Sequence, residues 1–330
     1  MSVQTIFENQ KKRSIQLRSE PLKSRLERLK KLRKWIFDNR VSIQEAIYAD
    51  LRKPAEEADL TEIYVTLSDT KKAIRNLKYW VISEPQGTSI PYLGTKAEIY
   101  YEPKGTVLII SPWNYPFSLA VGPLISAIAA GNTVFLKPSE LSANTSKLIK
   151  RMVEELFDED LVKVETGGVE VSTELLKLPF DHIFFTGSPR VGKIVMEAAS
   201  KHLASITLEL GGKSPCVVDE SANIKDAAEK IAWGKWLNAG QTCLAPDYVF
   251  VHEKIKDQFL AKLKDEAIKL YGNEDYSSII SDDHFKRLSE WQAEAVQQGG
   301  NLYFEGMTNE SERRLAPSIV EDVKPGTHLH

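Results

Sequence analysis

Two cysteines differ in their sequence surroundings, and one of them is placed where it could react. Cys243 ends the segment Gly240-Gln241-Thr242-Cys243, a polar stretch between a predicted helix and a predicted strand. Glycine and polar neighbours let a ligand approach closely, which favours a nucleophilic thiolate. A lone cysteine is also often a small buried hydrophobe, so both interpretations stay open for this residue. Cys216, in Ser-Pro-Cys-Val-Val, is predicted to lie in a buried strand.

One carboxylate and one amide suit acid–base and electrostatic chemistry. Glu209 lies in Leu208-Glu209-Leu210-Gly211-Gly212, at the predicted end of a strand. The flanking leucines predict partial desolvation, which makes a carboxylate a stronger general base; a glutamate turned toward water is the alternative. Asn114 lies in Pro112-Trp113-Asn114-Tyr115-Pro116, after another strand. Its amide suits a developing oxyanion, although most loop asparagines only form turns.

Two further strand ends carry residues that suit nucleotide binding. Phe185-Thr186-Gly187-Ser188, followed by Gly192, predicts a strand, a glycine turn and a helix. Backbone N–H groups at such a helix N-terminus can receive a pyrophosphate, although the spacing differs from G-x-G-x-x-G. In Lys137-Pro138-Ser139-Glu140, the lysine can donate to ribose or phosphate oxygens and Glu140 can accept from ribose hydroxyls. Taken singly, an ordinary strand-to-helix turn stays open for both segments.

Strand and helix patterns alternate from Gly105 onward. The predicted strands are 106–110, 133–137, 162–165, 181–185, 206–210 and 215–218, and the predicted helices are 118–130, 142–156, 171–177 and 190–202. This alternation predicts a doubly wound, parallel α/β sheet. The uncharged run Gly105–Leu136 has the length of a bilayer span. Its prolines and asparagines favour a strand, a helix and a second strand, so no membrane segment is expected.

The regions on either side of this core are predicted from periodicity. Residues 11–40 hold twelve Lys or Arg against three acidic residues, with apolar residues at helical spacing, which predicts one amphipathic helix with a basic outer face. Helices are also expected near 42–52 and 58–81, followed by an extended hairpin at 88–101. After Asp219, the expected elements are helices near 223–237, 254–270 and 283–298 and strands at 248–252 and 301–304.

Composition excludes several classes of protein. The length of 330 residues suits one large domain or two domains, and 42% hydrophobic with 27% charged residues is ordinary for a globular chain. Lys and Arg number 43 against 46 Asp and Glu, so no nucleic-acid partner is expected. The chain has only two cysteines and no apolar segment of signal-peptide length at its start, which predicts a cytoplasmic protein. Its six histidines show no zinc spacing, so no metal site is expected.

Together these segments resemble one family. Their order and approximate spacing resemble those of the NAD(P)-dependent aldehyde dehydrogenases. The segments are PWNYP, KPSE, FTGS with its following glycine, LELGGKSP and GQTC. The short N-terminus and Leu244–Tyr248 look like the class 3, fatty-aldehyde branch. This resemblance, which covers nearly the whole chain, implies a helical start and Rossmann-like cofactor domain over 1–208. It also implies an α/β catalytic domain over 209–330, incomplete here, and a hairpin near 88–102 that acts in forming a homodimer.

The resemblance also implies a reaction, the oxidation of an aliphatic or aromatic aldehyde to its carboxylic acid with NAD or NADP. Cys243 would attack the carbonyl as a thiolate, while Asn114 and the cysteine's own backbone N–H would hold the oxyanion. Hydride transfer to the nicotinamide would leave a thioester, which Glu209 would hydrolyse by activating water. The cofactor site would be lined by Trp113, Lys137, Glu140, Gly187, Ser188, Gly192, Leu210 and Gly211.

Two other functions stay open at this stage. The family pattern continues beyond Thr327 with an E-x-F-G-P segment that is absent up to His330, so a non-catalytic, nucleotide-binding fragment is one alternative. A CoA-acylating aldehyde dehydrogenase, which resolves the thioester with a thiol, is the other; Glu209 argues against it because that branch typically does without the base. Glu140 should repel the 2′-phosphate of NADP, yet the class 3 branch often accepts both cofactors.

Overall fold

The chain divides into two compact units. The computed structural model describes residues 2–272 and 276–330. The first unit comprises Met1–Ile43 and Asp59–Glu209, and the second comprises Gln44–Ala58 and Leu210–His330. The chain therefore passes from the first unit to the second directly after Glu209, and a short N-terminal segment belongs to the second unit.

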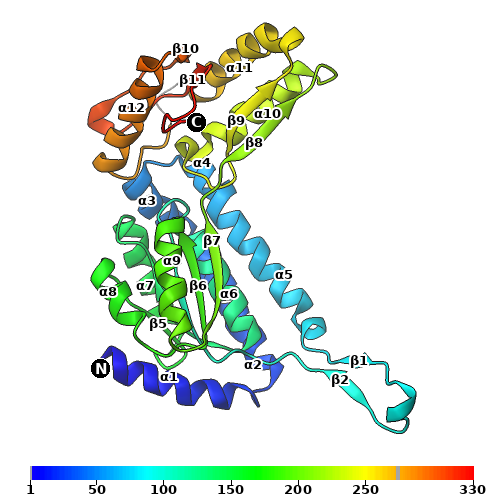
Figure 1. Ribbon diagram of the computed structural model, residues 1–330. Helices are drawn as coiled ribbons and strands as arrows, with labels where there is room; N and C mark the ends of the chain where they lie inside the picture. The colour runs from blue at the N-terminus through cyan, green and yellow to red at the C-terminus, as the bar shows by residue number, and fades with distance from the viewer. Residues whose placement is uncertain (1, 273–275) are drawn as a thin grey trace. The chain divides into compact units, whose positions relative to one another are not determined.

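A five-stranded sheet forms the centre of the first unit (Figure 1). Its strands are β3 (Thr106–Ile110), β4 (Thr133–Lys137), β5 (Val162–Val164), β6 (His182–Gly187) and β7 (Ser205–Leu210), in the order β5-β4-β3-β6-β7. β3 pairs in parallel with β4 and β6, and β4 with β5. All residues of β3 and β4 are buried, as continuous apolar strands of a covered parallel sheet should be. The prediction of a doubly wound α/β sheet is confirmed.

Helices connect these strands and pack against them. They are α6 (Ser118–Ala130), α7 (Ala143–Leu156), α8 (Val169–Leu175) and α9 (Pro189–Ser200), each within two residues of its predicted bounds. Gly131 ends α6 in the left-handed conformation at φ 90°, where a side chain would be strained. The uncharged run thus forms β3, α6 and β4, as expected. Of the helices in the part of the chain that the structure describes, none has the length and apolarity needed to span a membrane.

The N-terminal region departs from its prediction. In place of one helix over 11–40, the structure has α1 (Val3–Leu17) and α2 (Leu22–Asp38). Pro21 explains the break, because it lacks an N–H donor and disfavours helical backbone at the preceding residue.

The elements that follow are α3 (Arg40–Leu51), α4 (Ala55–Ala58), a π-helical turn (Asp59–Ile63) and α5 (Tyr64–Trp80). A hairpin is present, but it begins earlier than the predicted residue 88. It is the antiparallel pair β1 (Glu84–Gln86) and β2 (Ala97–Ile99), joined through a 3₁₀ turn at Ile90–Tyr92.

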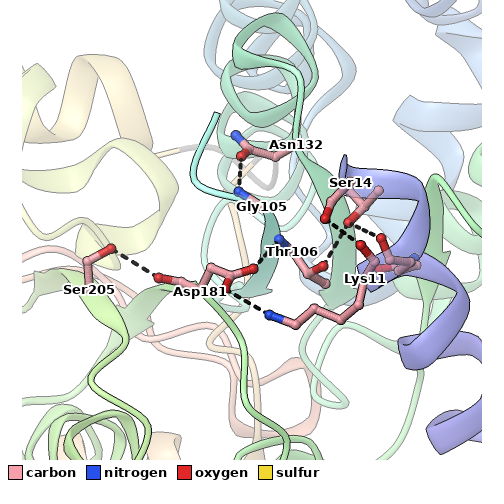
Figure 2. A network of polar contacts seen from close by, with 9 residues as sticks. Lys11, Ser14, Gly105, Thr106, Asn132, Asp181 and Ser205 are labelled. Carbon is pink, nitrogen blue, oxygen red and sulfur yellow. Dashed lines mark hydrogen bonds and ion pairs between the residues drawn. The ribbon is translucent and has the colours of Figure 1, made fainter. Parts of the chain in front are cut away.

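A polar network fixes α1 to the amino ends of the sheet strands (Figure 2). The Asp181 carboxylate accepts the backbone N–H of Thr106 at 2.7 Å and the Lys11 ammonium at 2.8 Å. Its backbone carbonyl accepts the Ser205 hydroxyl at 3.2 Å, so three strands and α1 meet at one residue. Gly105 lies so close that a Cβ there would come within 2.2 Å of the carboxylate. This network belongs to the edge opposite the carboxyl ends of the strands.

The second unit is built on a two-stranded parallel sheet. β8 (Ser214–Val218) pairs with β9 (Pro246–Val251), and α10 (Ile224–Trp236) packs with α11 (Lys256–Tyr271) over one face of it. The unit ends with α12 (Asp282–Gln297) and the antiparallel strands β10 (Asn301–Glu305) and β11 (Ser318–Glu321). Cys216 lies on β8 as predicted, but it is only half-buried, against the core cluster that these helices form.

Candidate active site

Three strands of the first unit end in segments that the sequence singled out. β4, β3 and β6 are adjacent and parallel, so their carboxyl ends lie at one edge of the sheet. Chain order reverses between β3 and β6, and ligands of doubly wound sheets bind outside the carboxyl ends at such a switch point. The structure therefore brings the segments around Asn114, Lys137 and Gly187 to the same edge.

The loop after β3 begins with a buried hydroxyl. Ser111 donates its backbone N–H to the Lys137 carbonyl at 3.1 Å, which extends the pairing of β3 with β4. Its side-chain oxygen is buried and has no hydrogen-bond partner among the described residues. Because an unpaired buried hydroxyl costs free energy, this atom marks a place where a polar ligand group fits. Trp113 and Asn114 follow on the same loop, and both are half-buried.

The turn after β4 holds an ion pair. The Lys137 ammonium lies 2.6 Å from a carboxylate oxygen of Glu140. The Lys137 side chain is 4% exposed, whereas that of Glu140 is 42% exposed. Ser146, on α7, donates its hydroxyl to the Ser139 carbonyl at 2.7 Å and fixes the turn between them. The buried cation is thus partly neutralised by a carboxylate that solvent and ligands can reach.

The turn after β6 opens a helix N-terminus. Ser188 is the N-cap of α9, and its hydroxyl accepts the backbone N–H of Val191 at 3.3 Å. A Cβ on Gly187 would come within 2.5 Å of the Phe185 ring, so a side chain does not fit there. Gly192 is buried within α9. The positive end of this helix dipole faces the edge where β6 ends, which suits an anionic ligand.

Glu209 occupies the penultimate position of β7, and the prediction of its partial desolvation is wrong. The side chain is exposed, while Leu208 and Leu210 are half-buried. Successive side chains of a strand point to opposite faces. The two leucines therefore lie on one face of β7, and the carboxylate points to the other face. The carboxylate of this chain is therefore open to solvent.

Cys243 follows a strained loop of the second unit. Asn238, Ala239 and Gly240 have φ values of 57°, 53° and 73°, three successive residues in the left-handed region. Each non-glycine residue in that region costs on the order of 1 kcal/mol, and such strain gathers at functional sites. The thiol of Cys243 is exposed, unlike that of a core cysteine. A Cβ on Gly212 would lie 3.0 Å from the Cys243 carbonyl, so glycine permits this close approach.

The side chain of Gln241 clamps this loop. Its amide nitrogen donates to the Asn238 carbonyl at 3.0 Å and to the Ser278 carbonyl at 3.1 Å, and its amide oxygen accepts the Ile280 N–H at 3.0 Å. The Asn238 backbone N–H in turn donates to Glu57 at 2.9 Å. Sequence reasoning gave Gln241 no role, although its place two residues before the cysteine was a signal. These bonds hold the strained backbone in place.

Two lysines surround one carboxylate just beyond the cysteine. Asp247 lies 2.5 Å from the Lys213 ammonium and 3.8 Å from that of Lys235. Burial lowers the pKa of Lys235, and the negative charge of Asp247 counters that effect. The cluster carries two cations for one anion, in the segments that precede and follow Cys243.

The predicted site residues divide between the two units. The second unit contains Leu210, Gly211 and Cys243. The first unit contains Trp113, Asn114, Lys137, Glu140, Gly187, Ser188, Gly192 and Glu209. Within the first unit, all of the cofactor candidates come from segments at or directly after the carboxyl ends of strands. Gly211, just after β7, has open space where a Cβ would stand.

Comparison with known proteins agrees with this arrangement. The model of the aldehyde dehydrogenase family matches residues 1–330. The 4,4'-diaponeurosporen-aldehyde dehydrogenase of Staphylococcus aureus is 47% identical over 304 residues, which cover 91% of this chain and 66% of the relative. Aldehyde dehydrogenase family 3 member A2 of Pongo abelii is 44% identical over 317 residues, which cover 94% of this chain and 64% of that protein. The chain thus spans slightly less than two thirds of the length of these relatives.

A solved structure, described as the substrate-bound state of Staphylococcus aureus AldH, has the same fold. Its TM-score is 0.94 with 43% sequence identity, over 100% of this chain and 72% of that one. The match of the family model to the full chain and the identity to family 3 members agree with the motifs of the sequence. The chain belongs to the aldehyde dehydrogenase family, beside its family 3 members.

Proposed function

We propose that this protein oxidises aliphatic or aromatic aldehydes to carboxylic acids with NAD or NADP. The observation that carries the proposal is the exposed thiol of Cys243 on a loop of successive left-handed residues. A strained backbone is retained where the surrounding structure over-determines it. Here the Gln241 side chain bonds the carbonyl of the strained residue Asn238 and ties it to Ser278 and Ile280. An inert structural cysteine requires neither exposure nor strain.

Cys243 is the proposed nucleophile, and Asn114 is the proposed oxyanion donor. The thiolate would add to the aldehyde carbonyl and give a hemithioacetal on Cys243. The side-chain amide of Asn114 would donate to the oxygen that gains negative charge, together with the backbone N–H of Cys243.

Glu209 is the proposed general base for hydrolysis of the thioester on Cys243. Its exposed carboxylate can accept a proton from water. A base at this position also distinguishes the reaction from CoA acylation, in which a thiol replaces the water.

The cofactor site is proposed at the carboxyl edge of the five-stranded sheet. When bound, the nicotinamide cofactor supplies the hydride acceptor. Two features of the chain fit such a group: the unpartnered buried hydroxyl of Ser111 and the N-terminus of α9, the positive end of the helix dipole, which directly follows β6. We assign Trp113, Lys137, Glu140, Gly187, Ser188 and Gly192 to this site, with Leu210 and Gly211 at its border. Lys137 and Glu140 would hold ribose or phosphate oxygens.

A homodimer and a cytoplasmic location complete the proposal. The β1–β2 hairpin carries Ile90 and Leu93, which are 83% and 80% exposed. Apolar side chains on a projecting hairpin suit a second copy of the chain. The variant Leu93→Asp should then lower the mass measured by light scattering to that of a monomer.

The proposed location is the cytoplasm, because a nucleophilic thiol needs a reducing compartment. Cell fractionation tests that location.

Formation of NADH from an aldehyde, in the absence of CoA, tests the proposed reaction. The purified protein should form NADH steadily with NAD and a simple aliphatic or aromatic aldehyde. NADH formation that depends on added CoA would establish the acylating reaction in its place. Binding of NADH without turnover of any aldehyde would identify a nucleotide-binding fragment.

A further inference from the structure

A completely buried carboxylate holds the first turn of α6. Glu62 is 0% exposed, and one of its oxygens, Oε2, accepts the backbone N–H of Phe117 at 2.9 Å and that of Ser118 at 3.0 Å. Both donors lie in buried residues, at 0% and 9% exposure. Glu62 reaches them from the π-helical turn Asp59–Ile63, more than fifty residues earlier in the chain.

The first turn of α6 needs this carboxylate. The first N–H groups of a helix have no partner within the helix, and a local side chain usually caps them. Phe117, at the N-cap of α6, makes no side-chain cap hydrogen bond. Because water is excluded from buried residues, removal of Glu62 would leave two N–H groups unsatisfied. The negative charge also suits the positive end of the helix dipole.

The capped turn is continuous with the loop that carries Asn114. The Tyr115 carbonyl accepts the Leu119 N–H at 3.0 Å, so the helical bonding starts at the residue after Asn114. The other end of the loop is fixed by the bond from the Ser111 N–H to the Lys137 carbonyl. Glu62 therefore sets the direction in which the chain leaves Asn114.

A local irregularity of the helix places Glu62 for this role. π-helical turns are rare and occur frequently at functional sites. The Thr66 hydroxyl donates to the Glu62 carbonyl at 2.6 Å and supports the end of this turn. Glu62 is buried in the π-helical turn, and Thr66, Thr70 and Ala73 are buried on α5, which follows it. A carboxylate on a buried helical face requires a dedicated partner, and the α6 N-terminus is that partner.

We propose that Glu62 is a positioning residue for oxyanion stabilisation, acting through the loop that carries Asn114. This inference rests on the proposed function, because it takes Asn114 as the oxyanion donor. Glu62 itself touches neither substrate nor cofactor. Its effect should therefore appear in the step that forms the Cys243 adduct and disappear when the Asn114 amide is removed.

The test is a double-mutant cycle between Glu62→Ala and Asn114→Ala. A misplacement near 1 Å can cost about 100-fold in rate, so Glu62→Ala should lower kcat/KM by roughly 10- to 100-fold with little change in NADH affinity. In the Asn114→Ala background the same change should cost less than about 2-fold, because residues that act through one group are not additive. Glu62→Gln is the matched control, since one amide oxygen can accept both N–H groups, and should retain activity within about 5-fold of wild type.

Hydrogen exchange at the Phe117 and Ser118 amides tests the cap without any turnover. Protection should be lost in Glu62→Ala and kept in Glu62→Gln. If the alanine variant does not fold, Glu62→Asp replaces it, because it keeps the charge but shortens the reach. Unchanged amide protection in these variants would overturn the inference. It would also be overturned if the loss of kcat/KM in the double variant equalled the product of the losses in Glu62→Ala and Asn114→Ala. A wild-type protein that binds NADH but oxidises no aldehyde contradicts the proposed function instead, and the exchange data still decide whether Glu62 holds the loop.

Discussion

The Lys137 ammonium lies 2.6 Å from the Glu140 carboxylate, at the end of the strand next to the one that leads to Asn114. The lysine is almost completely buried and the glutamate is accessible. A ligand at this edge of the sheet therefore meets the carboxylate as well as the cation. For a dinucleotide, the carboxylate favours ribose hydroxyls and disfavours a 2′-phosphate.

The variant Glu140→Gln should shift cofactor preference toward NADP. Glutamine keeps the shape and a hydrogen-bonding oxygen but removes the negative charge. The ratio of the NADPH and NADH dissociation constants should fall by about 10-fold, or about 1.4 kcal/mol. Fluorescence titration of both reduced cofactors measures this ratio without turnover. Lys177 and Glu174 form a pair of the same spacing on the surface, so Glu174→Gln is the matched control. An unchanged ratio in Glu140→Gln would remove Glu140 from cofactor selection.

The variant Cys243→Ser should abolish aldehyde oxidation while NADH binding survives. A hydroxyl is far less nucleophilic than a thiolate at neutral pH. Cys216→Ser is the control, because Cys216 lies half-buried on β8 and should be dispensable. Initial rates of NADH formation, with a parallel cofactor titration, measure both properties. Turnover of Cys243→Ser within about 10-fold of wild type, only about 1.4 kcal/mol in barrier, would refute the nucleophile assignment.

Asp181 should matter for stability and not for chemistry. Its carboxylate accepts a strand N–H and the Lys11 ammonium at the amino edge of the sheet. Asp181→Ala leaves the Thr106 N–H without this acceptor and should cost about 1–3 kcal/mol of unfolding free energy. Urea unfolding measures the loss. Asp38→Asn, which breaks an exposed pair with Lys34, should cost less than about 1 kcal/mol. Equal losses in both variants would contradict the role of this network.

His182 should make the first unit less stable in acid. Burial lowers the pKa of its imidazole, and the nearby Lys104 lowers it further. The folded pKa lies below the unfolded value of about 6.5, so the unfolded state binds the proton more readily and stability falls as pH falls through the folded pKa. The variant His182→Gln should flatten the loss of unfolding free energy between pH 8 and pH 5 that urea unfolding measures. The exposed His202 supplies a matched control variant, His202→Gln. A profile of His182→Gln that matches wild type would refute the prediction.

The parts of the fold that the sequence predicted are those in which local pattern and burial agree. β3 and β4 are continuous apolar runs because both faces of the sheet are covered, and their bounds were predicted within one residue. The break before α2 was missed because apolar spacing continues through it, although Pro21 was a visible signal. The alternation of side chains along β7 was overlooked, and so Glu209 was expected to be shielded.

Long-range partners explain the rest of what the sequence left out. The bonds between Glu62 and the first turn of α6 join residues 55 and 56 positions apart. A pattern of types and spacings carries no information about such a pairing. In the sequence, Glu62 is one acidic residue of the helix predicted near 58–81, next to Ile63 and one turn before Thr66. The strain at Ala239 was equally hidden, because alanine does not signal a left-handed backbone, although asparagine and glycine on either side of it tolerate that conformation.

The variant Glu209→Gln should separate the two halves of the proposed reaction. Collapse of the Cys243 adduct requires oxyanion donors, whereas hydrolysis of the thioester requires a water that has lost its proton. Glutamine keeps the shape of the side chain but loses its basicity, so general-base assistance of roughly 10²- to 10⁴-fold should vanish from hydrolysis. Rapid mixing with excess aldehyde should then give a burst of about one NADH per active site, followed by a slow steady rate. Mass spectrometry of the quenched protein should detect an acyl group on Cys243.

Two other outcomes would change the role of Glu209. If Glu209 also deprotonates Cys243, the burst itself should slow and its pH profile should shift. Steady turnover equal to wild type, without an acyl adduct, would exclude Glu209 as the base.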